Sequence, residues 1–252
     1  MSDTDFEENR FFLKDSIRLQ VDFSRTGQNL GIPAPPLQKP CPPECVRINL
    51  PDGEKALIRL GRMPLGEAIS GRQSVRRYTL AQLTMEDLSA LLFATQGVRS
   101  VLHAATALRT VPSAGARHAF ETYLAVNRVE TLSAGLYRYL PFDGQLAQLY
   151  VDPQIGYHAA SACLGQTFIG TAAVVFFWTV IPARMEWRYG MAAHKVIAID
   201  AGHVCQNLYL TCQSLHAGTC AIAAYNQEAC DRLLGVDGRE EFTIYLAPVG
   251  KR

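Results

Sequence analysis

Several familiar motifs of nucleotide-binding and hydrolytic proteins are absent from this 252-residue sequence. It has no GxGxxG after a predicted strand, no GxxxxGK[ST] loop, no GxSxG and no HExxH. The first two motifs mark dinucleotide and P-loop sites, the third marks a hydrolase nucleophile and the fourth a zinc protease. The sequence therefore gives no support to these four classes.

An excess of charge of either sign is also lacking, because 24 Lys and Arg stand against 23 Asp and Glu. A nearly neutral chain without a basic stripe is not typical of proteins that bind nucleic acids. The longest apolar run, AAVVFFWTV, is too short to span a bilayer, and the acidic, polar start MSDTDFEENR does not fit a signal peptide. We therefore expect no nucleic acid and no membrane as partners, and we expect a cytoplasmic location.

The seven cysteines form no dense framework, which is typical of reduced thiols. Cys41 and Cys45 are close in sequence, but a zinc site needs about four ligands and no matching pair lies nearby. His203, Cys205 and Cys212 are interpreted as a helix histidine and two buried thiols. We therefore expect no metal site.

The segment from Met191 to Leu215 is predicted to form one long helix. It contains no proline and only one glycine, Gly202, and its apolar residues recur at three- and four-residue steps. At 1.5 Å per residue the helix is about 35 to 40 Å long, so other elements must pack around it. A second stripe of this helix is polar: Asp200, His203, Asn207, Thr211 and Ser214. This stripe predicts a side that faces water, a partner subunit or a polar network, and Gly218 is expected to end the helix because glycine takes the left-handed cap most easily.

The remaining segments predict an α+β layered domain. Closely spaced prolines in GIPAPPLQKPCPPEC favour an extended arm, which we assign to residues 1–60, and residues 61–252 form the predicted domain. Helices are expected after Pro64, after a capping box of Thr84 and Asp87, and at NQEACDRLLGV. Strands are expected at ETYLAVNRV, GLYRYL, QLAQLY, AAVVFFWTV and EFTIYLAPVG. Because these strands follow one another mostly as a meander, an α+β fold is favoured over a doubly wound sheet.

A basic cluster, RQSVRRY, follows the helix predicted after Pro64. Arg72, Arg76 and Arg77 with Ser74 would suit a phosphate group, because arginine donates in a planar fork and keeps its charge at any pH. The alternative is a solvated basic turn, since short basic runs are common on protein surfaces.

Several motifs together resemble the nitroreductase family. RQSVRRY, PSAGARH, WRYG with IDAGHVCQNLYL, GTCAIAAY and APVGKR occur in the order of its SagB/ThcOx branch, whose known members oxidise azolines to azoles in modified peptides. The resemblance covers residues 64–252. It implies a three-layer fold, with a mixed, mostly antiparallel sheet flanked by helices around one long central helix. It also implies a homodimer with FMN bound across the subunit interface.

The same resemblance implies roles for individual residues. Contacts to the FMN phosphate and ribityl chain fall on Arg72, Ser74 and Arg76, and the basic C-terminal contact falls on Lys251 and Arg252. The loop that reaches a flavin across the dimer contains Pro112 and Ser113, the polar side chain near the ring is Gln166, and the backbone beside flavin N5 is that of Ala223 and Ala224. The small residues of GTCAIAAY would let a planar ring approach, although an ordinary core strand would also account for them.

The catalytic pair implied by the resemblance is Lys-Tyr in the azoline oxidases, but here the two positions are Arg188 and Tyr189. A buried lysine can lose its proton and act as a base, whereas arginine stays charged. Arg188 can therefore only bind anions or favour the ionised phenol, which makes Tyr189 the candidate acid or base. The alternative is a packing cluster of aromatic and cationic side chains at the start of the long helix.

The resulting hypothesis is an FMN-dependent oxidoreductase of the SagB/ThcOx type, which transfers a hydride between flavin N5 and a small or peptide-derived substrate. One alternative is a nitro- or quinone-reductase that takes its hydride from NAD(P)H. A second is a flavin-binding subunit without turnover that stabilises a biosynthetic complex, with residues 1–60 as its docking arm. The substrate, the direction of hydride flow and the electron acceptor stay open.

Overall fold

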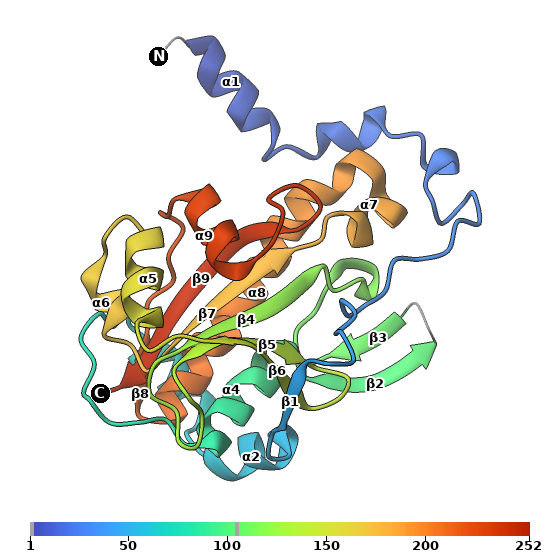
Figure 1. Cartoon of the computed structure of the whole chain (residues 1–252). Coiled ribbons are helices and arrows are strands. Elements are labelled where there is room, and N and C mark those ends of the chain that lie inside the picture. Colours follow the sequence, from blue (N-terminus) through green and yellow to red (C-terminus); the bar gives the residue numbers. More distant parts are fainter. Residues whose placement is uncertain (1–2, 104–105) are drawn as a thin grey trace.

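A seven-stranded sheet forms the middle layer of the computed structural model, which describes residues 3–103 and 106–252 (Figure 1). Its strand order is β1-β6-β5-β4-β7-β9-β8, and all neighbouring strands run antiparallel. Its strands are β1 (Val46–Asn49), β4 (Phe120–Val126), β5 (Gly135–Leu140), β6 (Gln145–Val151), β7 (Val174–Val180), β8 (Ala217–Thr219) and β9 (Phe242–Lys251). A separate hairpin consists of β2 (Val98–His103) and β3 (Thr106–Arg109). The predicted antiparallel α+β fold is confirmed.

Helices cover both faces of this sheet. The α-helices are α1 (Asp3–Phe11), α2 (Gly53–Leu60), α3 (Leu65–Gly71), α4 (Met85–Gln96), α5 (Ile155–Ala162), α6 (Thr167–Gly170), α7 (Ala183–Tyr189), α8 (Ala193–Ser214) and α9 (Gln227–Leu234). Short 3₁₀ turns are η1 (Asp15–Gln20), η2 (Phe23–Arg25), η3 (Ala114–Ala116) and η4 (Gly190–Ala192). One apolar cluster joins the sheet to α4 and α8, and a second joins it to α5, α6 and α9. The structure thus has the predicted three layers.

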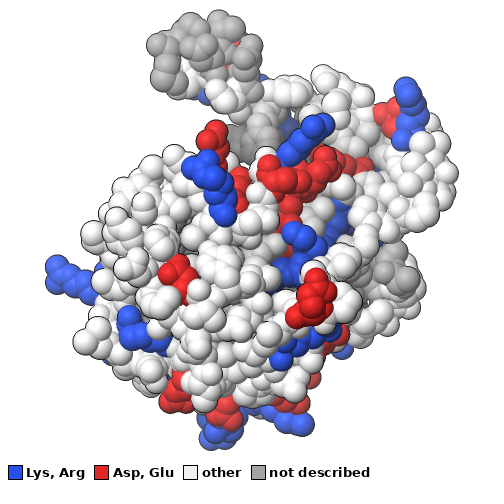
Figure 2. All heavy atoms as spheres, in the orientation of Figure 1, with Lys and Arg blue, Asp and Glu red and all other residues white. Residues whose placement is uncertain are grey.

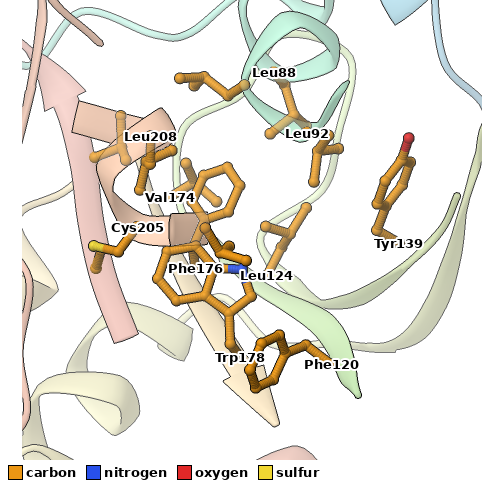
Figure 3. Packing of buried hydrophobic residues seen from close by; sticks show 14 of the residues in the cluster. Leu88, Leu92, Phe120, Leu124, Tyr139, Val174, Phe176, Trp178, Cys205 and Leu208 are labelled. Carbon is orange, nitrogen blue, oxygen red and sulfur yellow. The ribbon is translucent and has the colours of Figure 1, made fainter. Parts of the chain in front are cut away.

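The central strand β7 supplies both clusters because successive side chains of a strand point to opposite faces. Phe176 and Trp178 belong to the cluster with α4 and α8, whereas Phe177 belongs to the other cluster. Figure 3 shows Phe176 and Trp178 among side chains that include Cys205 and Leu208 of α8. A fully apolar strand such as AAVVFFWTV is what burial on both faces requires.

The long helix was predicted correctly except at its end. α8 spans 22 residues, and its polar stripe serves mainly an internal network: Asp200 and Thr211 are buried, and Asn207 donates to the carbonyl of Ala94 at 2.8 Å. The prediction that Gly218 ends the helix is wrong, because His216 takes the left-handed conformation (φ +50°). Gly218 lies in β8, where a Cβ would come within 2.5 Å of Val75, so close packing and not capping requires the glycine.

The N-terminal arm is tied to the domain through its main chain. Four of its carbonyl oxygens accept side-chain hydrogen bonds: Ile32 from Trp187 (2.7 Å), Pro35 from Arg117 (3.2 Å), Leu37 from Arg109 (2.8 Å) and Pro40 from Arg138 (2.9 Å). The prolines leave this segment extended, so its carbonyls stay free to accept these bonds. Within residues 46–60, β1 belongs to the sheet and α2 packs against α4.

Two buried carboxylates of the domain, Glu121 and Glu241, bind Lys39 of the same arm. Glu121 accepts from Arg184 at 2.5 Å and from the backbone N–H of Lys39 at 2.8 Å. Glu241 is bound by the Lys39 ammonium at 2.5 Å and by the hydroxyl of Tyr123 at 2.9 Å. A buried charge is stable only when it is paired in this way, so the arm and the domain stabilise each other.

Candidate functional site

The basic cluster lies against the edge of the sheet. After α3 the chain runs beside β8, where the backbone N–H of Val75 donates to Thr219 at 2.9 Å and Ser74 bridges to Thr219. These bonds fix the backbone of residues 72–76 in an extended conformation. Alternate side chains of an extended segment point the same way, so Arg72, Ser74 and Arg76 share one side.

One end of this segment is joined to the long helix. The hydroxyl of Tyr209 on α8 shares a 3.0 Å hydrogen bond with Ser74 and accepts from the backbone N–H of Ala221 at 2.8 Å. The guanidinium of Arg72 lies 5.2 Å from the centre of the Tyr209 ring. A single tyrosine therefore connects the basic segment to the chain that leads to Ala223 and Ala224.

The other end of the segment is joined to α6. The guanidinium of Arg76 lies 5.9 Å from the centre of the Phe168 ring. Gln166, two residues earlier, donates through Nε2 to the carbonyls of Ala224 at 2.9 Å and Cys163 at 3.0 Å. The structure thus brings Arg72, Ser74, Arg76, Gln166 and Ala224 into one ring of contacts, and the exposed Ala223 lies beside it.

The two C-terminal basic residues differ in their surroundings. Lys251 is held by Asp87 at 2.9 Å and donates to the carbonyl of Leu215 at 3.0 Å, so its charge is already balanced. Arg252 donates to Gln213 of α8 at 3.1 Å, and the Gln213 Oε1 atom also lies 3.6 Å from a Cβ placed on Gly71, next to Arg72.

Three arginines remain available to a bound anion at this edge. In residues 3–103 and 106–252, no ion pair engages Arg72, Arg76 or Arg252. Figure 2 shows acidic and basic side chains interspersed over the face that it presents. Arg72, Arg76 and Arg252 are therefore cations without a carboxylate partner among the described residues.

The candidate catalytic pair lies at the end of α7, against the loop that contains Pro112 and Ser113. Gly115 of this loop has φ +60°, and a Cβ placed on it would lie 2.7 Å from the hydroxyl of Tyr189 and 2.9 Å from Nε of Arg188. Only glycine fits here, because a side chain would be strained by the backbone and would collide with both residues. The loop and the pair therefore form one unit.

A buried carboxylate on α8 holds this loop in place. Asp200 accepts from the backbone N–H of Ala114 at 3.2 Å and from the hydroxyl of Ser113. Burial raises the pKa of Asp200, and the two hydrogen bonds oppose that rise. Its second oxygen lies 3.8 Å from Nδ1 of the half-exposed His203. Ser113 also accepts from the backbone N–H of His118 at 3.0 Å, which fixes the other end of the loop.

Several arginine side chains lie near one another behind this loop. Burial lowers the pKa of Arg117, and repulsion from Arg184 and Arg188 lowers it further. Burial also lowers the pKa of His118, to about 3, with further repulsion from Arg109, Arg117 and Arg184. His118 is therefore neutral at physiological pH, and arginines carry the charge of this corner.

The two groups of candidate residues are separated on one chain. Asp200, which holds the Ser113 loop, and Tyr209, which holds Ser74, lie about 13 Å apart along α8. In Figure 1, α7 and the C-terminus likewise lie at opposite ends of the domain. A single subunit thus presents a basic site at one end and the Arg188–Tyr189 pair at the other.

Comparison with protein families decides between the possible classes, because the nitroreductase family model matches residues 69–251. The chain belongs to the nitroreductase family. It is therefore an oxidoreductase, and nitroreductases generally bind a flavin.

Individual relatives agree with this assignment. A protein of Methanocaldococcus jannaschii that carries the name of a nitroreductase is 32% identical over 209 residues, which cover 83% of this chain and 98% of the relative. A nitroreductase structure from Ralstonia eutropha has a TM-score of 0.65 at 25% identity and covers 87% of this chain and 98% of its own. A third, from Anabaena variabilis, has a TM-score of 0.66 at 26% identity, and the match covers 83% of this chain but only 42% of that one.

Some contact residues of this nitroreductase were missed at the level of sequence. Phe168 lies in no motif, and Tyr209 lies within IDAGHVCQNLYL without a role assigned to it; each joins the basic segment through a contact between elements far apart in the chain. Asp200 was recognised only as one member of a polar stripe. The polar stripe on the long helix indicated that Asp200 has a polar partner. The sequence did not indicate that this partner is the loop containing Ser113 and Ala114.

Metal and membrane sites find no support in the described parts of the chain. Residues 3–103 and 106–252 contain no group of three or more His, Cys, Asp or Glu that could hold a metal ion. The helices within these ranges are also too short or too polar to cross a bilayer.

Proposed function

We propose that this nitroreductase binds FMN and transfers a hydride between a substrate and flavin N5, as a SagB/ThcOx-type dehydrogenase does. The observation that carries this proposal is the ring of contacts that joins the basic segment of residues 72–76 to Gln166 and Ala224. Its donor set fits the cofactor, because a dianionic phosphate needs several guanidinium groups without carboxylate partners. A planar ring in turn needs small neighbours that let it approach the backbone.

Each residue of this chain then has a defined task. Arg72, Arg76 and Arg252 neutralise the phosphate, and Ser74, already oriented by Tyr209, donates or accepts at the ribityl end. The exposed Ala223 and Ala224 leave their backbone open to the ring. Gln166 uses Nε2 to hold the carbonyl of Ala224, so only its Oε1 can accept from the ring. Lys251 is assigned to supporting the basic edge, because Asp87 already balances its charge.

We also propose that the functional unit is a homodimer. Pro112, Ser113 and the Arg188–Tyr189 pair are far from the basic edge of their own subunit, and a two-fold dimer would bring them to the basic edge of the partner. The exposed side of α8 and of α3, which includes Ile69 (56% exposed) and Ile199 (49% exposed), supplies an apolar surface for such an interface. In this arrangement Tyr189 moves a proton at the substrate while Asp200 keeps the loop in position.

The competing function is a nitro- or quinone-reductase that takes its hydride from NAD(P)H. The names of the relatives from Methanocaldococcus jannaschii and Ralstonia eutropha favour it. A more distant structure, 15% identical with a TM-score of 0.53, is an NADPH:FMN oxidoreductase of Vibrio harveyi in complex with NAD⁺. Another, 17% identical with a TM-score of 0.59, is the microcin synthetase McbBCD complex of E. coli with truncated pro-MccB17 bound. At these identities both support the fold alone, so the donor has to be measured.

The absorbance spectrum of the purified protein tests the cofactor, and Arg72→Ala tests its site. Loss of a charged hydrogen bond costs about 1.5 to 3 kcal/mol, so the dissociation constant for FMN should rise about 10- to 150-fold. The matched control is Arg77→Ala, since Arg77 is the neighbouring exposed arginine on the other side of the segment. Equal FMN retention by Arg72→Ala and Arg77→Ala would contradict the assigned phosphate site. Bleaching of the flavin band by NAD(P)H would favour the reductase.

A further inference from the structure

The guanidinium of Arg188 lies in the candidate catalytic corner without a carboxylate partner. It is half-buried, and within residues 3–103 and 106–252 it takes part in no ion pair and no hydrogen bond. Its Nε and the hydroxyl of Tyr189 lie 2.9 and 2.7 Å from the same point beside Gly115. A charged donor fork and a hydroxyl donor therefore stand next to each other at the surface of the loop.

Three acidic side chains near this corner are engaged with partners other than Arg188. Glu121 is bound to Arg184, Glu186 accepts from His194 at 2.8 Å, and Asp200 is held by the Ser113 loop. The imidazole of His118 is neutral, and the charges of Arg109, Arg117 and Arg184 act on it. Arg117 stacks on Trp187 at 4.8 Å, and burial together with repulsion from Arg184 and Arg188 lowers its pKa, so a second cation lies near Arg188. No carboxylate of the described residues therefore forms an ion pair with Arg188.

We infer that Arg188 and Tyr189 form an anion-binding subsite, and that the substrate of this nitroreductase carries a carboxylate. A carboxylate is planar and accepts two hydrogen bonds side by side, which matches a guanidinium fork with a phenol hydroxyl beside it. This inference rests on the proposed function, because the proposal brings the substrate to this corner. The lysine of the azoline oxidases can act as a base, whereas Arg188 keeps its charge. In this inference Arg188 selects the substrate, and Tyr189 moves the proton.

The test compares 4-nitrobenzoate with 4-nitrobenzamide, which differ in charge but hardly in shape. Binding of each compound to the oxidised, flavin-loaded protein is measured by calorimetry without a reductant, so no turnover is required. The wild type should bind the carboxylate about 10- to 100-fold more tightly than the amide at low salt, as expected for charge-assisted hydrogen bonds. High salt should reduce the difference, because the site is only half-buried.

Three variants make the test specific. Arg188→Met keeps the length of the side chain and removes its charge, so it should abolish the preference for the carboxylate. Arg188→Lys should retain a smaller preference, because ammonium is a point charge without the fork. Arg25→Met is the matched control, since Arg25 is exposed on the arm near α7 and should leave the preference unchanged.

The outcomes separate this inference from the proposed function. Equal affinity for the two compounds in the wild type, or an unchanged preference in Arg188→Met, would refute the subsite while FMN binding and turnover remain intact. Weaker NADPH binding by Arg188→Met with an unchanged carboxylate preference would assign the anion to the nicotinamide cofactor and would also refute it. A wild-type protein that binds no flavin would contradict the proposed function, and the two nitro compounds could still be compared on that protein.

Discussion

Glu121→Gln tests whether the buried ion pair beneath the arm determines the stability of the domain. Glu121 and Arg184 are 3% and 1% exposed, and the carboxylate also accepts from the backbone N–H of Lys39. Glutamine has nearly the same shape but no charge, so Arg184 would keep its charge in the interior without compensation. Removal of one partner from a buried pair costs about 3 to 5 kcal/mol, a large part of the free energy of unfolding of an ordinary domain.

Urea denaturation at fixed protein and flavin concentration measures this loss. With a slope of about 3 kcal/mol per molar urea, the midpoint should fall by about 1 to 1.7 M. Glu228→Gln is the matched control, because Glu228 and Arg232 form an exposed pair at 3.5 Å. Its midpoint should change little, since exposed pairs contribute about 0 to 1 kcal/mol.

A double variant shows whether the uncompensated charge is the cause. Glu121→Gln with Arg184→Met removes both charges, so it should be more stable than Glu121→Gln alone. If Glu121→Gln and Glu228→Gln had the same midpoint, Arg184 would not depend on Glu121, and the arm would not be anchored as described.

Two further predictions concern pH and assembly. Because the folded pKa of His118 is about 3, below its ordinary value of 6.5, the neutral ring stabilises the folded state above pH 6.5, and this contribution is lost as the pH falls from 6.5 toward 3. The free energy of unfolding should therefore fall by up to about 1.4 kcal/mol per pH unit in this window, and His118→Asn should flatten the slope; parallel slopes would contradict the assignment. Light scattering of the flavin-loaded protein at micromolar concentration should show a dimer, and a flavin-loaded monomer would refute the shared site.

The sequence predicted most of the sheet because its strands are strongly patterned. The apolar run Val174–Val180 and the alternation in Gly135–Leu140 have few competing conformations, and the Thr84–Asp87 capping box is present as expected. The hairpin of residues 98–109 was missed, since RSVLHAATALRT contains several alanines and leucines that suit a helix equally well. Its pairing is decided by tertiary contacts, which a local pattern does not contain.

Part of the candidate site could likewise be predicted from the sequence, and part could not. Residues within one motif, such as Arg72 and Ser74, could be placed together from the sequence because an extended segment determines their side. The contact of Gln166 with Ala224 joins residues 58 positions apart, and only the resemblance grouped them. The engagement of Lys251 with Asp87 could not be foreseen, because the capping carboxylate of α4 carries no sign in the sequence that a distant lysine will reach it.

The arm also bears on the hypothesis of a docking subunit without turnover. A segment that recruits a partner by its backbone needs free carbonyl and N–H groups, but four carbonyls between residues 32 and 40 already accept from Trp187 and three buried arginines. Figure 1 shows that α1 projects away from the domain, and near it Phe12 and Leu13 are 47% and 66% exposed. The first part of the arm is therefore better suited to a docking role than the second. Its second part instead holds Trp187, the residue before Arg188 and Tyr189, which links the arm to the site where turnover is proposed.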